Sequence, residues 1–174
     1  MKIKLISTIA LLWLVIIGCK VNRTSPPILA KEFPIILQEN AKDCGPICLA
    51  MLCKYYDLNI ELDSLKKLSS FDPVEGTTLL GLSEACDSIG IKNLGIRVTY
   101  DKILEYDNPS IAHWDNNHYV VVYKMTKDST WVADPAVGKI RYSREEFCKS
   151  WSKGEGNTSP EEGVMLITEL DAKK

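Results

Sequence analysis

The chain has 174 residues, with 21 lysine and arginine residues against 23 aspartate and glutamate residues, and its formal charge at pH 7 is −2. This mild acidity, together with the absence of a basic stripe in the sequence, argues against a nucleic acid as partner. The length that remains after an amino-terminal segment suits one domain with a single core, and we expect that domain over residues 35–170.

The first eighteen residues have the pattern of an export signal. Lys2 and Lys4 give a basic start, and residues 5–17 are an apolar run without a charge. A basic start, roughly 7–15 apolar residues and a small-residue cleavage site are typical of a secretory signal, whereas a membrane span needs about 20 apolar residues. We therefore expect residues 1–18 to be a signal peptide or a membrane anchor.

The signal-like segment ends in Ile16-Ile17-Gly18-Cys19, which resembles a bacterial lipobox. This resemblance implies cleavage after Gly18 and a lipid attached to Cys19. The alternatives are an uncleaved single-pass anchor in the inner membrane and a cytosolic hydrophobic tail. In the first two cases the domain faces the periplasm or the cell exterior, because the two lysines hold the amino end inside. Residues 19–34 contain prolines and polar residues without a period, and we expect them to be a tether.

Three helices are expected in the first half of the domain. Pro46 is favourable at the first position of a helix, and the apolar residues that follow it have helical spacing. A second helix follows, and a third begins after Gly76-Thr77-Thr78 and ends at Gly90. The expected ranges are residues 46–56, 62–68 and 79–89.

Strands dominate the second half of the domain. The segment 119–124 is almost purely β-branched and aromatic, and residues 130–133 are its expected antiparallel partner. Ser143 and Glu146 form a capping box that opens a helix through Trp151. Because helices come first and strands second, the expected fold class is α+β with a mainly antiparallel sheet. Further strands are expected around residues 94–98, 110–112, 139–142 and 164–168.

Cys44 stands just before the first expected helix and is followed by Gly45 and Pro46. The thiolate is the attacking form of cysteine, and a helix amino terminus favours it because unpaired backbone N–H groups stabilise negative charge. Gly45 is expected to leave room for the backbone of a substrate. The spacing alone equally allows a buried cysteine that caps the helix.

Five cysteines follow Cys19, and export would permit disulfides among them. An odd number leaves at least one free thiol, for which Cys44 is the candidate. No pair has the spacing of zinc ligands, and we expect neither a metal nor a cofactor. Cys48, Cys53 and Cys86 are interpreted as buried small hydrophobes, and the disulfide status of these three and of Cys148 stays open.

The sequence contains two histidines, His113 and His118, as possible bases for the thiol. His118 directly precedes the strongest strand and is expected at the rim of the sheet, whereas His113 is expected in a loop or at the edge of the core. Asp134 closes the next strand. Pairing Met125 with Ser129 would place His118 and Asp134 on one face as diagonal neighbours, and a shift by one residue would separate them. The catalytic interpretation therefore requires an odd loop or a bulge between these strands.

Together, these motifs resemble those of the peptidase C39 family, papain-like cysteine peptidases best known as the amino-terminal domain of bacteriocin-exporting ABC transporters. The resemblance covers about residues 35–152, in the right order and spacing. The segments that carry it are Gln38, Asp43-Cys44-Gly45, Gly76-Thr77-Thr78, Pro109 to Trp114, Asn117 to Val121, Asp134-Pro135 with Gly138, and Glu146-Phe147 through Trp151.

The resemblance implies a papain-like fold and a role for each site residue. Cys44 would be the nucleophile, His118 the general base and then acid, and Asp134 the group that orients His118. Gln38 and the backbone N–H of Cys44 would stabilise the oxyanion. The resemblance also implies a peptide or protein substrate that is hydrolysed through an acyl-enzyme.

Transporter-borne members of this family cut leader peptides after paired glycines in the cytoplasm, on chains that also carry transmembrane and ATPase domains. The present sequence contains no Gly-x-x-x-x-Gly-Lys-Ser/Thr phosphate loop, and its signal-like segment points to the opposite side of the membrane. We expect a membrane-attached cysteine peptidase that processes leader or secreted peptides, with cleavage after Gly-Gly and a separate transporter as options. The alternatives are another papain-like amidase or acyltransferase, such as a cell-wall peptide hydrolase, and an inactive peptide-binding module.

Overall fold

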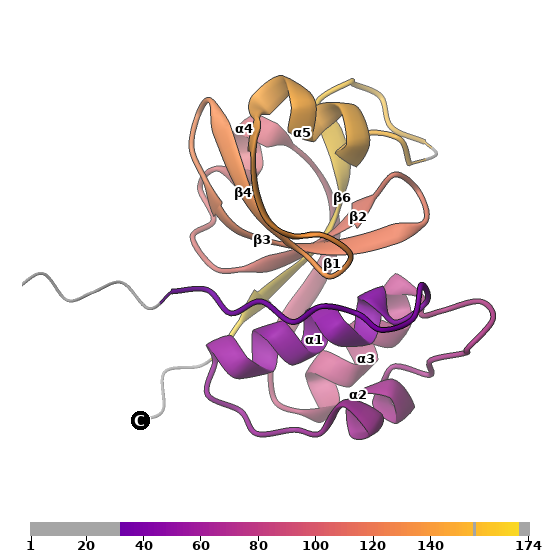
Figure 1. The fold of residues 1–174 in the computed structure, drawn as a ribbon. Helices are drawn as coiled ribbons and strands as arrows, with labels where there is room; N and C mark the ends of the chain where they lie inside the picture. The colour runs from indigo at the N-terminus through magenta and orange to yellow at the C-terminus, as the bar shows by residue number, and fades with distance from the viewer. Residues whose placement is uncertain (1–31, 155, 171–174) are drawn as a thin grey trace, which may run out of the picture. The chain divides into compact units, whose positions relative to one another are not determined.

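A computed structural model describes residues 32–154 and 156–170 of the chain (Figure 1). The expectations of a signal or anchor at residues 1–18, of a lipid on Cys19 and of a tether up to residue 31 lie outside these ranges. Across the two described ranges, no helix is both long enough and apolar enough to cross a membrane.

The first half of the described chain forms three helices that pack together on one face of the sheet (Figure 1). They are α1 (Cys44–Tyr55), α2 (Leu62–Leu68) and α3 (Leu79–Ser88), close to the expected ranges. Helix α1 is buried along most of its length, and its apolar side chains share one core cluster with Ile111 and Leu166 of the sheet. The burial of this apolar helix between the sheet and two other helices removes it from water, which is the main stabilising contribution to such a layer.

The second half supplies a sheet in which all neighbouring strands are antiparallel, so the expected α+β class is confirmed. The order of the six described strands is β1-β6-β2-β3-β4-β5. The last strand along the chain thus lies between the first two, and the hairpins β2–β3 and β3–β4 form the centre. The bounds are β1 Lys92–Thr99, β2 Ser110–Trp114, β3 His118–Met125, β4 Ser129–Asp134, β5 Gly138–Ser143 and β6 Glu162–Glu169.

Two further helices cover the other face of the sheet: α4 (Tyr100–Ile103) and α5 (Arg144–Trp151). The predicted capping box opens α5, because the Ser143 N–H donates to Glu146 Oε2 at 2.8 Å and the Glu146 N–H donates to Ser143 Oγ at 3.3 Å. Helix α4 was not anticipated, since a single turn of four residues leaves no helical period in the sequence.

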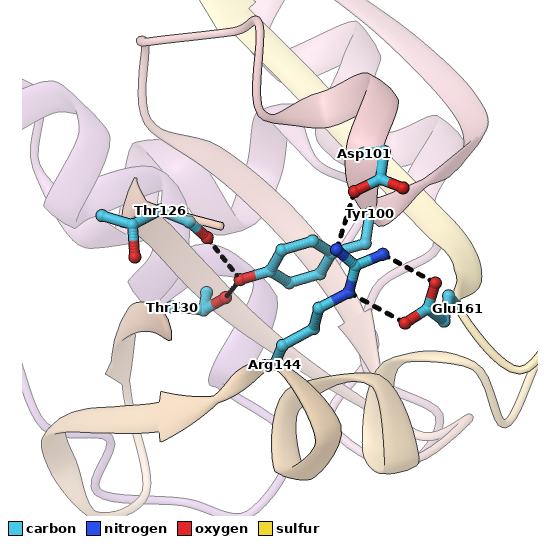
Figure 2. Close-up of polar contacts among 6 residues, drawn as sticks. All are labelled: Tyr100, Asp101, Thr126, Thr130, Arg144 and Glu161. Atoms are coloured by element: carbon cyan, nitrogen blue, oxygen red, sulfur yellow. Dashed lines mark hydrogen bonds and ion pairs between the residues drawn. The ribbon is translucent and has the colours of Figure 1, made fainter. Parts of the chain in front are cut away.

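A polar cluster around Arg144 joins the elements on this face (Figure 2). The guanidinium donates to both carboxylate oxygens of Glu161, at 2.8 and 2.7 Å, and to Asp101 Oδ1 at 2.7 Å. It also lies 4.6 Å from the centre of the Tyr100 ring. The Tyr100 hydroxyl donates to the carbonyl of Thr126 at 2.9 Å and lies 2.9 Å from the Thr130 hydroxyl. The cluster therefore ties α4, the β3–β4 turn, α5 and the segment before β6 together. Thr130, the partner of the Tyr100 hydroxyl, also links strand β4 to the cluster.

The β3–β4 hairpin contains the bulge that the catalytic interpretation requires. At the turn, Met125 pairs with Thr130, so the expected pairing of Met125 with Ser129 is wrong. The hairpin closes through a two-residue turn in which the Thr126 N–H donates to the Ser129 carbonyl at 2.8 Å. One extra residue of β3, Tyr123, then shifts the register, and beyond it Val121 faces Ala133. Beyond the bulge the strands therefore have the same register that pairing of Met125 with Ser129 would have given. This is the register predicted to bring the start of β3 and the end of β4 together.

The bulged residue has a packing partner from the start of the described chain. The ring of Tyr123 stacks on that of Phe33, with centroids 4.9 Å apart and planes 5° apart. Phe33 is 4 % exposed and belongs to the core, two residues before the expected start of the domain. A contact between residues so far apart in sequence thus accompanies the bulge, and β-bulges are known to redirect side chains near active sites.

Candidate active site

Cys44 is the first residue of α1, which begins two residues earlier than expected. Pro46 is therefore the third residue of the helix, a position that needs no N–H donor. The Cys44 side chain is largely buried, with 7 % of the residue exposed. Its thiol sits where unpaired backbone N–H groups and the helix dipole favour a negative charge, as the sequence predicted.

Gly45 was expected to leave room for the backbone of a substrate, but its surroundings point to a role in packing. A Cβ atom built on Gly45 would lie 3.0 Å from Thr77 Cγ2 and 3.2 Å from Leu82 Cδ2. The missing side chain therefore lets α1 pack closely against the segment that leads into α3, and it does not open a path for a substrate backbone. The error arises because the sequence shows that a glycine is present but not which neighbour approaches it.

His118 and Asp134 meet at the edge of the sheet. His118 is the first residue of β3 and Asp134 the last of β4, and His118 Nε2 lies 2.8 Å from Asp134 Oδ1. The same carboxylate oxygen accepts the N–H of Ala136 at 2.8 Å, which fixes its orientation. Because Nε2 is bound to the carboxylate, Nδ1 is the ring nitrogen left for the thiol.

The electrostatic environment of His118 connects it to Cys44. Burial alone lowers the pKa of His118, but hydrogen bonds with Asp134 and Cys44 and the charges of both groups oppose burial and raise the pKa to about 9. The imidazole is therefore protonated at neutral pH, beside a thiol at a helix amino terminus. A cysteine thiolate paired with an imidazolium is the reactive form of such a site.

Gln38 is attached to the same corner through its backbone. Its N–H donates to the carbonyl of Pro135 at 2.8 Å, next to Asp134. Its side-chain oxygen Oε1 is buried and has no hydrogen-bond partner among the described residues. Buried polar atoms are nearly always paired, so Oε1 is an exception among the acceptors of the described chain.

The second histidine lies apart from this arrangement. His113 lies within strand β2 and not in a loop, and its ring centre is 5.3 Å from that of Tyr119. Burial lowers the pKa of His113, in contrast to the raised value of His118. His113 is therefore neutral at pH 7, and burial is the cause of its lowered pKa.

The remaining described cysteines are buried and carry free thiols. Burial raises the pKa of Cys48 well above its ordinary value, and it raises the pKa values of Cys53, Cys86 and Cys148 to about 11, 12 and 11. Such thiols are inert at neutral pH. Within residues 32–154 and 156–170, no group of three histidine, cysteine or acidic side chains is placed to hold a metal ion.

The sequence did not reveal one buried ion pair beside the nucleophile. Asp43, which precedes Cys44, is 3 % exposed, and its Oδ1 lies 2.9 Å from Lys66 Nζ of α2. Asp43 was noted only as part of a motif, and Lys66 is one of two adjacent lysines on a short helix. No local pattern distinguishes the lysine that turns inward.

Comparison with known proteins gives a family match over most of the described chain. The model of the peptidase C39 family matches residues 32–155. The lactococcin-G-processing and transport ATP-binding protein LagD of Lactococcus lactis subsp. lactis is 39% identical over 124 residues, which are 68% of this chain and 18% of that protein. The colicin V secretion/processing ATP-binding protein CvaB of Escherichia coli is 32% identical over 120 residues, 68% of this chain and 17% of that protein. The chain thus spans less than a fifth of the length of these two relatives.

Solved structures agree with the expected fold. A double glycine motif protease from an AMS/PCAT transporter, in complex with the leader peptide, has a TM-score of 0.69 and 28% identity, covering 79% of this chain and 91% of that chain. The peptidase domain of Streptococcus ComA, a bifunctional ABC transporter, has a TM-score of 0.68 and 26% identity, covering 80% of this chain and 100% of that chain. The helical layer on an antiparallel sheet is therefore the fold of these peptidase domains.

Proposed function

The chain belongs to the peptidase C39 family, and we propose that it is a cysteine peptidase in which Cys44 is the nucleophile. The observation that carries this proposal is the contact of His118 with both Asp134 and Cys44, which raises the pKa of His118 to about 9. The interaction requires a bulge in β3 and a helix that begins at the thiol. Both are features of the described chain.

The proposed mechanism has two steps, formation of an acyl-enzyme on Cys44 and its hydrolysis, and His118 transfers a proton in each. The Cys44 thiolate attacks the carbonyl carbon of the peptide, and the carbonyl oxygen becomes an oxyanion. Protonated His118 then gives its proton to the leaving amine, which leaves a thioester on Cys44. A water molecule attacks this thioester after losing a proton to His118, and the carboxylic acid product leaves as the thiolate and imidazolium are restored.

The oxyanion requires donors that are free in the unliganded enzyme. We assign this role to the backbone N–H of Cys44 and to the side-chain amide of Gln38. Donors of this kind contribute roughly 3–4 kcal/mol to the lowering of the barrier. The backbone hydrogen bond from Gln38 to Pro135 supports this assignment, because it places residue 38 beside Asp134, at the corner where His118 is bound.

Asp134 is proposed to hold the imidazole in the productive orientation. Its Oδ1 accepts from His118 and from the N–H of Ala136, so the carboxylate is fixed by the turn that follows β4. A carboxylate on Nε2 also stabilises the imidazolium that forms during the reaction.

The proposed substrate is a leader peptide or another secreted peptide. One structural neighbour is a double glycine motif protease in complex with a leader peptide, which supports cleavage after Gly-Gly as the first specificity to test. The signal-like residues 1–18 and Cys19 support a membrane-attached enzyme that faces the periplasm or the cell exterior. A separate transporter would then be the partner that delivers the substrate.

The reactivity of Cys44 gives a direct test of the enzyme assignment. The protein is treated with a neutral haloacetamide near pH 7 under reducing conditions, and the labelled cysteine is identified by mass spectrometry. We expect fast labelling of Cys44 that is lost in H118A, with C44A reporting the background from other thiols. Labelling of Cys44 at the rate of an ordinary free thiol would exclude the proposed pair. Hydrolysis of a peptide library that includes Gly-Gly sequences then addresses the substrate.

A further inference from the structure

Asp43 occupies a helix N-cap position without behaving as a cap. Its residue is 3 % exposed, and its side chain accepts no hydrogen bond from the first turn of α1. An aspartate at this position ordinarily accepts from the N–H groups of the second or third helical residue. In α1 these residues are Gly45 and Pro46, and proline has no N–H to give. The Asp43 carboxylate is therefore held by other groups.

Those groups come from α2 and from the loop before α1. Lys66 Nζ lies 2.9 Å from Asp43 Oδ1, and Asn40 Nδ2 donates to Asp43 Oδ2 at 3.1 Å. The Lys66 ammonium also lies 5.0 Å from the centre of the Phe71 ring. The side chains of Asp43 and Lys66 are 5% and 24% exposed, so the pair is largely screened from water. A buried carboxylate of this kind requires a cation or several donors to remain charged.

The same carboxylate is the charged group nearest in sequence to the proposed nucleophile. His118 and Tyr119 of β3 and Cys48 of its own helix each interact electrostatically with Cys44. Of these, His118 is the cation, and Asp134 already binds it through Nε2. An uncompensated negative charge on Asp43 would oppose a thiolate at Cys44, because like charges in close proximity disfavour ionisation.

The ion pair also holds the loop that connects the two proposed oxyanion donors. At one end of this loop the Gln38 N–H is bound to the Pro135 carbonyl at 2.8 Å, and at the other the Asp43 N–H donates to the Asn40 carbonyl at 3.1 Å. Cys44 follows directly. Lys66 is thus the contact through which α2 fixes the end of the loop that carries the Cys44 N–H.

We propose that Lys66 is a positioning residue for Cys44: it holds the Asp43 carboxylate away from the first turn of α1 and cancels its charge beside the nucleophile. This inference deepens the proposed function and rests on it. Without Lys66, the carboxylate would either turn to the N–H groups of that turn or remain as an unpaired anion. Both outcomes slow attack by Cys44 and leave the binding of a peptide largely unchanged.

The test compares four variants with the wild type: K66M, D43N, the double variant D43N/K66M, and K67M. Lys67 is exposed and next to Lys66 on α2, so K67M is the matched control for loss of a lysine from this helix. The readouts are the rate constant for haloacetamide labelling of Cys44 at pH 7 and the separate kcat and KM for a cleaved peptide. Thermal unfolding of each variant confirms that it is folded at the assay temperature.

We expect K66M to lower the labelling rate and kcat by about tenfold, because an unpaired carboxylate on the preceding residue disfavours the attacking thiolate, with KM little changed. D43N keeps the shape of the side chain without the charge, so it should resemble the wild type. The double variant should recover most of the activity lost in K66M, which a purely structural role of Lys66 would not produce. K67M should match the wild type.

The proposal is overturned if K66M labels as fast as K67M, or if D43N/K66M is slower than K66M. Should K66M fail to fold, K66Q retains a side chain that can donate a hydrogen bond to Asp43, and the proposal still predicts slow labelling because the charge is not cancelled. Failure of the proposed function has a different signature, since wild-type Cys44 would then label no faster than in H118A. Only the inference about Lys66 fails if wild type and H118A differ as expected while K66M and K67M do not.

Discussion

The polar clusters on the two faces of the sheet differ in how completely their hydrogen bonds are satisfied. Around Arg144, the guanidinium is bound by Glu161 and Asp101, and the Tyr100 hydroxyl by Thr126 and Thr130 (Figure 2). Around Cys44, the Gln38 side-chain oxygen has no partner among the described residues, and the first turn of α1 receives no side-chain cap.

This difference separates a structural network from a reactive one. Paired polar groups rigidify the elements that they join. A buried acceptor without a partner is costly to folding, and Gln38 Oε1 is such an acceptor on the segment that leads to the thiol. Substitutions in the first cluster should therefore change stability, and substitutions in the second should change activity.

The largest expected effect distinguishes the two histidines. H118A should reduce kcat by about 10²–10⁴-fold, the usual contribution of a general acid and base. H113A should retain most of the activity, because His113 packs on Tyr119 and burial lowers its pKa. Steady-state hydrolysis of a cleaved peptide measures both. Equal losses in the two variants would show that the assignment of the base is wrong.

Loss of the proposed oxyanion donor should come next. Q38A should lower kcat by about 10²–10³-fold with little change in KM, because the donor acts on charge that develops only in the transition state. The comparison with Q38E is informative, since a carboxylate has the same shape but repels an oxyanion. A Q38A enzyme with unchanged kcat would remove Gln38 from the mechanism.

A stability effect is expected at Gly45, which lies beside the nucleophile but serves packing. G45A should destabilise the fold by about 1–3 kcal/mol, the usual cost of overpacking a close contact. Gly95 is the matched control, because a Cβ there would meet only Leu79 Cδ2, at an ordinary 3.7 Å. Denaturant unfolding of G45A and G95A measures the difference. Equal stability of the two variants would contradict the packing role.

The smallest effect is expected from the paired cluster. R144M should lower the Tm by a few degrees and leave kcat unchanged, because exposed ion pairs stabilise proteins only modestly. K149M removes an exposed lysine from the same helix and should leave the Tm nearly as it is. A large loss of activity in R144M would mean that the two clusters are coupled through the sheet.

The elements of this fold could be predicted from sequence because each has a local signature. The β-branched run at residues 119–124 and the capping box at Ser143 depend only on neighbours a few residues away. The site residues were found because Cys44, His118 and Asp134 stand at the ends of such elements. Their contact, however, depends on the bulge at Tyr123, and that residue packs on Phe33, 90 positions earlier.

Apart from the single turn of α4 and the pairing at the β3–β4 turn, the main features that could not be predicted from the sequence are contacts between distant segments. Gly45 was assigned to substrate access because the approach of Thr77 and Leu82 cannot be known before the helices are packed. Lys66 and Lys67 are indistinguishable in sequence, and only the packing of α2 beside the loop at Asp43 selects one of them. The partners of these side chains could thus be identified only from the tertiary structure.

The direct test of the central claim is the titration of the two histidines by NMR, with H113N to assign the signals. The pKa of His118 is raised from 6.5 to about 9, so its ion pairs stabilise the folded protein fully below pH 6.5, and this contribution is lost as the pH rises through about 9. The pKa of His113 is lowered by burial. We predict that His118 titrates near pH 9 and His113 below 6.5. A His118 that titrates at or below 6.5 would contradict the proposed association of Cys44, His118 and Asp134.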